Sequence, residues 1–241
     1  MTVPIKDLAR TLLDEPRWVL ARWMLLSGRA EVTGLSGDRR RFVASSTVWP
    51  VIAVVGRPDA PFIEGAASAL AAGGFVVAAE EHGDHVAAVL PGWRRLGASA
   101  LAWIAGTPLP GPPPTSDARL LETGELAALI HVPTALREAV VTASGWAPVA
   151  GAFSGGAPVS FCFARAVTET LWDVGLATLE GYRRRGLAKK ALRCLAAAMS
   201  DRHTWPVWIA EDEDAASRQF AASFGFAPSG RLALFRPRVG H

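Results

Sequence analysis

Short apolar runs and helix-spaced apolar residues alternate along the first hundred residues. Leucines and tryptophans recur at spacings of three to five between Leu8 and Leu26, which predicts helical structure there. Two continuous apolar runs bounded by turn residues predict strands at Val51–Val55 and Phe75–Ala79, with a helix of small residues from about Pro61 to Ala72 between them. A short helix near 85–90 and a strand near 98–104 complete the pattern. These residues therefore predict a small α/β unit.

The second half of the chain has a more regular pattern. A helical stretch at 125–142 contains Pro133, which should kink or split it because proline removes a helix hydrogen bond. The other predicted helices are 186–200, with Leu187, Ala191, Leu195 and Met199 at intervals of four on one face, and 214–224, whose first amides Asp214 can cap. Period-two and continuous apolar runs predict the strands, at 149–153, 159–163, 172–179, 206–210 and 232–235.

The segment between the halves is rich in proline. Five prolines lie between Pro108 and Pro114, and proline favours an extended, solvated chain. We therefore expect an N-terminal α/β half at 1–106, a linker at 107–116 and a second domain at 117–241.

Composition excludes several classes of protein. Of the 241 residues, 50% are hydrophobic and the net charge is +3, so a disordered chain is excluded and a nucleic-acid partner is not indicated. The two cysteines cannot build a disulfide framework, and no His, Cys or Asp set has metal-ligand spacing. The sequence shows no signal peptide and no apolar window of membrane-spanning length. We expect a cytoplasmic protein without a membrane partner, and its arginine and alanine bias is typical of a GC-rich bacterial genome.

The most informative stretch runs from Trp172 to Lys190. A predicted strand leads into the basic loop Arg183-Arg184-Arg185, then into Gly186 and a helix. The first amides of a helix lack intrahelical partners and lie at its positive end, and glycine lets the backbone approach a ligand closely. Such a loop can hold a pyrophosphate; the alternative is a solvated basic turn.

This stretch resembles a known family. Arg183-Arg-Arg-Gly-Leu-Ala188 fits the Arg/Gln-x-x-Gly-x-Gly/Ala motif of the GNAT N-acetyltransferase superfamily. Pro206–Ser217 and Ser223-Phe-Gly-Phe226 are similar to the family's next strand and helix, and the resemblance covers about residues 117–237. It implies a GNAT-type mixed, mostly antiparallel sheet flanked by helices. The N-terminal half resembles, more loosely, the degenerate first half of FR47-like members.

The resemblance also implies how each residue would act. The backbone of Leu176, Ala177 and Thr178 would pair with the pantetheine arm of acetyl-CoA, and Asp214 takes the place of the motif asparagine. The pyrophosphate would be held by the motif and the residues around it, namely Arg183, Arg184, Arg185, Gly186, Leu187, Ala188 and Lys189. Arg183 opens the motif, and packing or capping is an alternative role for it. No metal is expected.

The catalytic groups are less clearly marked. Many members carry a tyrosine as general acid where this chain has Ala221, and the only tyrosine here is Tyr182, beside the loop. Asp173, near the start of the fourth-strand candidate, and Glu211, after the fifth, are the candidate general bases. The alternatives are a strand-end salt bridge for Asp173 and a solvated acidic turn for Glu211.

Two classes of function follow. The first is an acetyl-CoA-dependent N-acetyltransferase in which the amine of a small or amino-acid-like acceptor attacks the thioester directly. The second is a non-catalytic acyl-CoA-binding or regulatory module that has kept the fold and lost the acid. The acceptor is not readable from the sequence, and the oligomeric state is left open, with a homodimer as one alternative.

Overall fold

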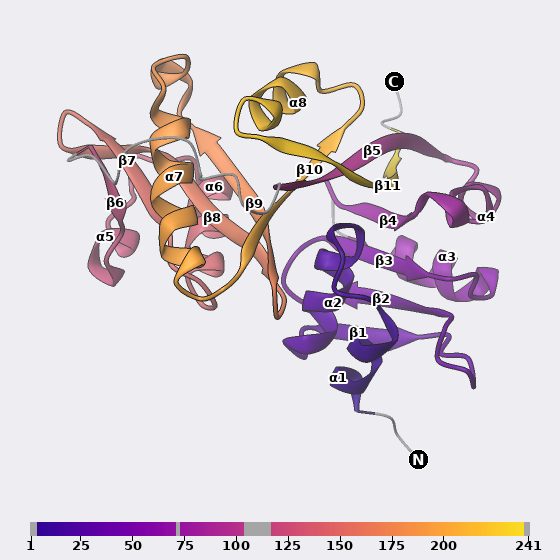
Figure 1. Ribbon diagram of the computed structural model, residues 1–241. Coiled ribbons are helices and arrows are strands. Elements are labelled where there is room, and N and C mark those ends of the chain that lie inside the picture. Colours follow the sequence, from indigo (N-terminus) through magenta and orange to yellow (C-terminus); the bar gives the residue numbers. More distant parts are fainter. Residues whose placement is uncertain (1–3, 71–72, 104–116, 239–241) are drawn as a thin grey trace. The chain divides into compact units, whose positions relative to one another are not determined.

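The computed structural model describes residues 4–70, 73–103 and 117–238, which divide into two compact units (Figure 1). Unit 1 comprises residues 1–102 and 208–241, and unit 2 comprises residues 103–207. The predicted linker, 107–116, lies outside the described residues. The segment from residue 208 onward groups with the N-terminal half, whereas the sequence assigned it to the second domain. The division into domains at 107–116 stays a prediction.

Unit 1 contains a mixed sheet. In the order in which they lie in the sheet, its strands are β1 (Ala30–Thr33), β2 (Phe42–Ser46), β3 (Val51–Val55), β4 (Phe75–Ala79), β11 (Phe226–Pro237), β5 (Trp93–Trp103) and β10 (Trp205–Glu211). The helices of this unit are α1 (Ile5–Leu8), α2 (Val19–Leu26), α3 (Ala60–Ser68), α4 (Gly83–Val89) and α8 (Ala215–Ala222). Strands β3 and β4 are parallel because α3 connects them as a crossover, whereas β1–β2, β2–β3 and β4–β11 are antiparallel.

One core cluster of unit 1 lies between its sheet and the helices α3 and α4. Ile52 and Val54 of β3 pack with Ile63 and Ala67 of α3, and Phe235 of β11 belongs to the same cluster. Both predicted strands are present: β3 is buried throughout, and β4 is buried except at Phe75, which is half-buried. Strands β1 and β2 were not predicted.

Unit 2 is a mostly antiparallel sheet with helices on both faces. The start of β10 pairs in parallel with β9 (Leu171–Thr178), which is followed by β8 (Ala157–Val167), β7 (Ala150–Ser154) and β6 (Ala118–Leu120) in antiparallel order. Helices α5 (Thr123–Ala127) and α6 (Thr134–Ala143) pack on β8 side chains such as Phe161 and Phe163. Helix α7 (Leu187–Ser200) runs across β6, β7 and β8 (Figure 1).

Several sequence predictions for unit 2 are confirmed. The helical stretch at 125–142 is split into α5 and α6, and Pro133 lies at the N-cap of α6. The residues Leu187, Ala191, Leu195 and Met199, spaced by four, are buried along one side of α7. The predicted α/β class with a mixed, mostly antiparallel sheet flanked by helices is confirmed. Among the helices of the described residues, none has the length and apolar character needed to cross a bilayer.

Candidate functional site

The basic loop of unit 2 ends at a helix start that no side chain caps. Strand β9 leads into a short 3-10 turn at Glu180–Tyr182, and α7 begins at Leu187 with Gly186 at its N-cap. Gly186 has φ +75°, a left-handed conformation that favours glycine, and a Cβ built on it would meet no atom within 4 Å. The first amides of α7 lie at the positive end of a 14-residue helix, and within the described part of the chain no side chain caps them.

Exposed arginines surround this helix start. Arg183 donates from Nε to the carbonyl oxygen of Thr178, at 3.4 Å, so it ties the loop to the end of β9. The guanidinium of Arg185 lies 5.2 Å from the ring centroid of Tyr182. Arg184 has φ +64°, and its side chain is exposed and forms no hydrogen bond or ion pair with any described residue. The structure thus brings the predicted loop residues together around one helix terminus.

The end of β9 has one side free of strand pairing within the described residues. Leu176, Ala177 and Thr178 pair with Cys162, Phe161 and Ser160 of β8. Strand β10 pairs with β9 only at the first three residues of each strand. The backbone groups on the second side of 176–178 therefore have no partner strand, which is the condition for pairing with an extended ligand.

Gly175, in the same strand, has a packing reason to be glycine. A Cβ there would lie 2.4 Å from the ring of Phe163. This close approach of a neighbouring side chain accounts for the glycine without a ligand.

Asp173 lies in β9 at the point where β10 pairs with it. The residue is 3% exposed, and Nη2 of Arg165 donates to its Oδ1 at 2.9 Å. Burial raises the pKa of the Asp173 carboxyl, and the Arg165 charge opposes this shift. The strand-end salt bridge that the sequence left as an alternative is therefore present, and a catalytic role for Asp173 stays a prediction.

Glu211 and Asp214 belong to unit 1. Glu211, at the end of β10, forms an ion pair with Arg236 of β11. Asp214 caps α8, because the Ser217 amide donates to its Oδ1 at 2.8 Å. The predicted capping role is confirmed, whereas the roles of Glu211 in proton transfer and of Asp214 in cofactor binding stay predictions.

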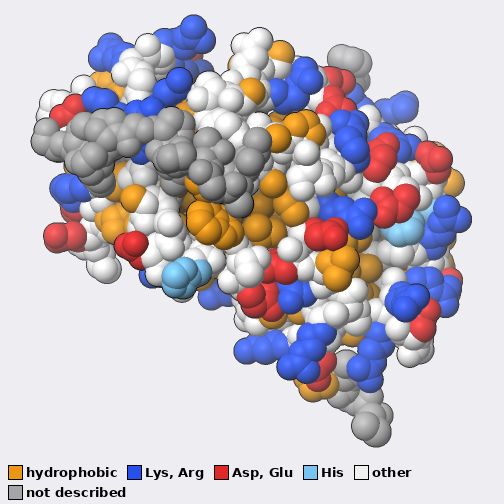
Figure 2. Space-filling model, in the orientation of Figure 1, with side chains coloured by type: hydrophobic (Ala, Val, Ile, Leu, Met, Phe, Trp, Pro, Cys, Tyr) orange, Lys and Arg blue, Asp and Glu red, His pale blue; other side chains and the backbone are white. Residues whose placement is uncertain are grey.

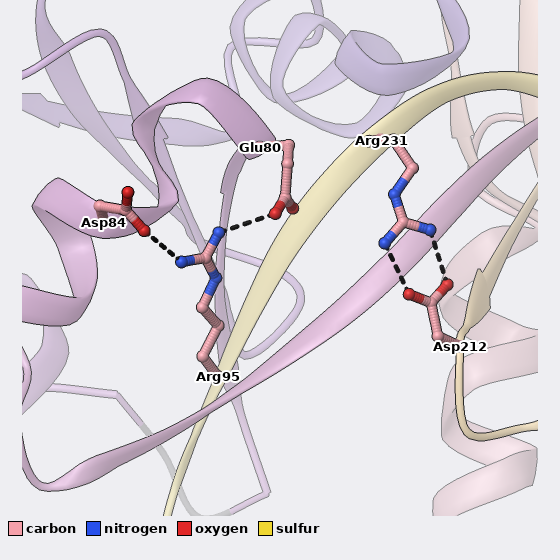
Figure 3. Close-up of polar contacts among 5 residues, drawn as sticks. All are labelled: Glu80, Asp84, Arg95, Asp212 and Arg231. Atoms are coloured by element: carbon pink, nitrogen blue, oxygen red, sulfur yellow. Dashed lines mark hydrogen bonds and ion pairs between the residues drawn. The ribbon is translucent and has the colours of Figure 1, made fainter.

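The two acidic residues between Glu211 and Asp214 each form an ion pair with an arginine. The sequence analysis did not predict these pairs. Asp212 accepts two hydrogen bonds from the guanidinium of Arg231, at 2.6 and 2.8 Å (Figure 3), and Glu213 pairs with Arg94. The Arg231 guanidinium holds the pKa of the Asp212 carboxyl below its usual value. Gly97 makes room for this pair, since a Cβ there would lie 2.4 Å from Asp212 Oδ2. A glycine inside the apolar β5 run was the available sequence signal.

A second cluster of charges lies beside this pair in unit 1. Arg95 donates to Glu80 at 2.7 Å and to Asp84 at 2.5 Å (Figure 3). A Cβ at Gly83 would lie 2.4 Å from Arg95 Nη2, so the guanidinium occupies the space that a side chain at this position would need. The two clusters join β5, β11 and the ends of β4 and β10, and they hold the acidic turn in place.

Ala221 and Cys162 are both buried, so neither position presents a reactive side chain to solvent. Ala221 is fully buried in α8, so this position offers no proton donor. Burial raises the pKa of the Cys162 thiol well above its usual value, which agrees with a core cysteine.

Within the described residues, no group of three His, Cys, Asp or Glu side chains could hold a metal ion. On the face in Figure 2, basic and acidic side chains are interspersed, and no continuous basic surface for nucleic acid is visible there.

Comparison with known proteins found one matching family model and several solved structures with a similar fold. A family model described as GNAT acetyltransferase matches residues 150–235. A GCN5-related N-acetyltransferase-like protein from Streptococcus suis 89/1591 is 17% identical with a TM-score of 0.72, and the match covers 98% of each chain. An acetyltransferase from the GNAT family of Colwellia psychrerythraea is 14% identical with a TM-score of 0.57, covering 95% of this chain and 93% of that one. A GCN5-related N-acetyltransferase from Kribbella flavida is 16% identical with a TM-score of 0.56, covering 100% and 98%.

These likenesses extend over both halves of the chain. At such identities they concern the fold, and they confirm the GNAT-type architecture predicted from the sequence. No curated protein matches the sequence. The FR47-like subtype stays a prediction.

Proposed function

Residues 150–235 belong to the GNAT acetyltransferase superfamily, and from this we propose that the protein is an acetyl-CoA-dependent N-acetyltransferase acting on a small amine. The observation that carries the proposal is the start of α7, which no described side chain caps, with open space beside Gly186 and the guanidinium of Arg184, which pairs with no described residue. A helix terminus of this kind binds phosphate through backbone amides and charge together.

The neighbouring strand supports the same ligand. A pantetheine arm has amide groups that can pair with a strand backbone, and 176–178 has one unpaired side among the described residues. This side belongs to the strand that leads directly into the loop. The amides of Leu187, Ala188 and Lys189 would hold the pyrophosphate, and Arg184 would add charge to it.

The reaction needs a proton acceptor for the amine, which is a side chain of this protein or an ordered water. The neutral amine attacks the thioester carbonyl carbon, the C–S bond breaks, and the acceptor nitrogen loses its proton. Asp173 is the first candidate to take that proton, because burial raises the pKa of its carboxyl, and Glu211 is the second. With Ala221 in place of the family's tyrosine, water would protonate the leaving thiolate.

A second candidate function is a non-catalytic acyl-CoA-binding module. Two observations favour it: Ala221 is buried, and Asp173 is nearly buried and paired with Arg165. Under this function the loop would bind acyl-CoA and no acetyl group would be transferred.

One experiment separates the two functions. Calorimetry measures binding of CoA and acetyl-CoA, and thiol release measures turnover with a panel of primary amines across pH 6.5–9.5. Turnover above the rate without amine supports the transferase. Binding with no turnover on the whole panel supports the binding module, and absence of CoA binding contradicts both.

A further inference from the structure

Unit 1 contains a groove of about 820 Å³ between the β1–β2 edge of its sheet and helix α3. Its lining residues lie between positions 31 and 70, so they are distinct from the loop of unit 2. Nothing in the proposed acetyl transfer uses this groove. Its volume falls within the range of about 300–1,000 Å³ that is typical of small-molecule sites.

The floor of the groove is polar because of the strand register. Glu31 of β1 is the cross-strand partner of Ser45 in β2, and Ser45 is the partner of Ile52 in β3, so all three lie on one face of the sheet. Ile52 is buried in the cluster that contains Ile63 of α3. Helix α3 thus covers β3, and the polar residues on β1 and β2 are left beside it.

The carboxylate of Glu31 has no counter-ion among the described residues. Among the described residues that line the groove, Glu31 is the only one with a charged side chain. Glu31 and the hydroxyls of Thr33 and Ser45 form no side-chain hydrogen bond or ion pair with any described residue. The groove therefore offers one negative charge and two free hydroxyl groups on its floor.

The wall of the groove is apolar and carries an aromatic ring. Phe62, Gly65, Ala66 and Ala69 recur at helical spacing along one side of α3. Phe62 is 42% exposed, and Trp49 lines the groove as well. An exposed phenyl ring that lines the same groove as a carboxylate attracts an organic cation, which can pair with the charge and stack on the ring face.

We propose that this groove binds a primary ammonium ion attached to a flat apolar body, with Glu31 pairing with the ammonium group. An anion would be repelled by Glu31, and a neutral apolar molecule would leave the carboxylate unpaired. The proposal is independent of the acetyl-CoA site, because it concerns equilibrium binding to unit 1 without any acyl donor.

The test is calorimetric titration of the full chain with tryptamine and phenethylamine, each compared with its neutral alcohol, tryptophol or 2-phenylethanol. At low salt we expect each amine to bind at least tenfold more tightly than its alcohol. Glu31→Gln should remove this difference by weakening amine binding about tenfold, with the alcohol affinity within twofold of wild type. Added salt should weaken binding of the amines only.

Two further variants make the site assignment specific. Gly65→Leu adds bulk where a Cβ meets no atom within 4 Å and φ is not left-handed, so the helix should form and the groove should be blocked to amines and alcohols. Glu64→Gln removes a carboxylate from the same helix outside the lining and should leave binding unchanged. The proposal is overturned if neither amine shows saturable binding, if amine and alcohol bind equally, or if Glu31→Gln and Glu64→Gln behave alike.

Discussion

Substitution of Gly186 tests the proposed pyrophosphate site most directly. Gly186 has φ +75°, and the space where its Cβ would lie is empty, so a side chain can be added without a clash. Asn and Asp are the side chains that tolerate this backbone conformation best. The pair Gly186→Asn and Gly186→Asp therefore differs in one negative charge and shares nearly the same shape and backbone cost.

The effect of these substitutions on folding stability and the effect of the added charge on CoA affinity can be measured separately. The left-handed conformation should cost each variant about 1 kcal/mol of folding free energy, which lowers the melting temperature by about 2–4 °C in a chain of this length. A carboxylate about 4 Å from a phosphate charge is repelled by about 1 kcal/mol in water and about 4 kcal/mol at an effective dielectric constant of 20. Gly186→Asp should therefore bind CoA between about fivefold and about a thousandfold more weakly than Gly186→Asn.

The assay is calorimetric titration with CoA at two salt concentrations, together with thermal unfolding of both variants. Pantetheine, which lacks the pyrophosphate, serves as the control ligand and should not distinguish Asn from Asp. High salt should reduce the difference in CoA affinity between the two variants, because it screens the added charge. Equal CoA affinities in two folded variants at low salt would refute the reasoning and move the pyrophosphate away from the α7 terminus.

Three other predictions follow from single contacts. If its carboxylate takes the acceptor proton, Asp173→Asn should lower the acetylation rate by about 10²–10⁴ near pH 7, with a loss that shrinks as pH rises; wild-type rates at pH 7 would make the residue structural. Gly175→Ala should lower the free energy of unfolding by about 1–3 kcal/mol in denaturant titrations because its Cβ meets the Phe163 ring, and Phe163→Leu should restore part of it; an additive loss in the double variant would argue against the contact. Arg119 lowers the pKa of Glu125 to about 2, so this pair stabilises the fold at neutral pH and its contribution should fade as pH falls from about 5 through 2. Urea unfolding of Glu125→Gln should show less acid dependence than wild type over that window, while parallel curves would contradict the assignment.

Much of the candidate site was predictable because it is local. A strand, a basic loop, a glycine and an amphipathic helix follow one another within twenty residues, and each is specified by its own period or turn residue. Gly186 at the start of α7 and Asp214 at the cap of α8 needed no distant partner to be recognised. The split at Pro133 followed from proline chemistry alone.

Partners of charged side chains were not predictable in this way. Asp173 pairs with Arg165 across two strands, and Asp212 pairs with Arg231, a residue 19 positions later in the chain. The acidic turn was expected to be either solvated or catalytic, yet each of its four acidic residues has a partner in the fold. A single sequence does not state which cation will lie opposite a given carboxylate, because register and sheet order decide it.

Hydrophobic period, proline, glycine and helix-end amides act within a few residues, so the sequence alone specified the longer helices, the apolar strands and the helix start at Gly186. Tertiary structure decided which residues share a face. Short strands such as β1 and β6 have little apolar pattern of their own, and they form because a neighbouring strand offers free backbone groups. The groove beside Glu31 depends on that pairing as well, because only the register of β1 on β2 and β2 on β3 brings its carboxylate beside the aromatic side of α3.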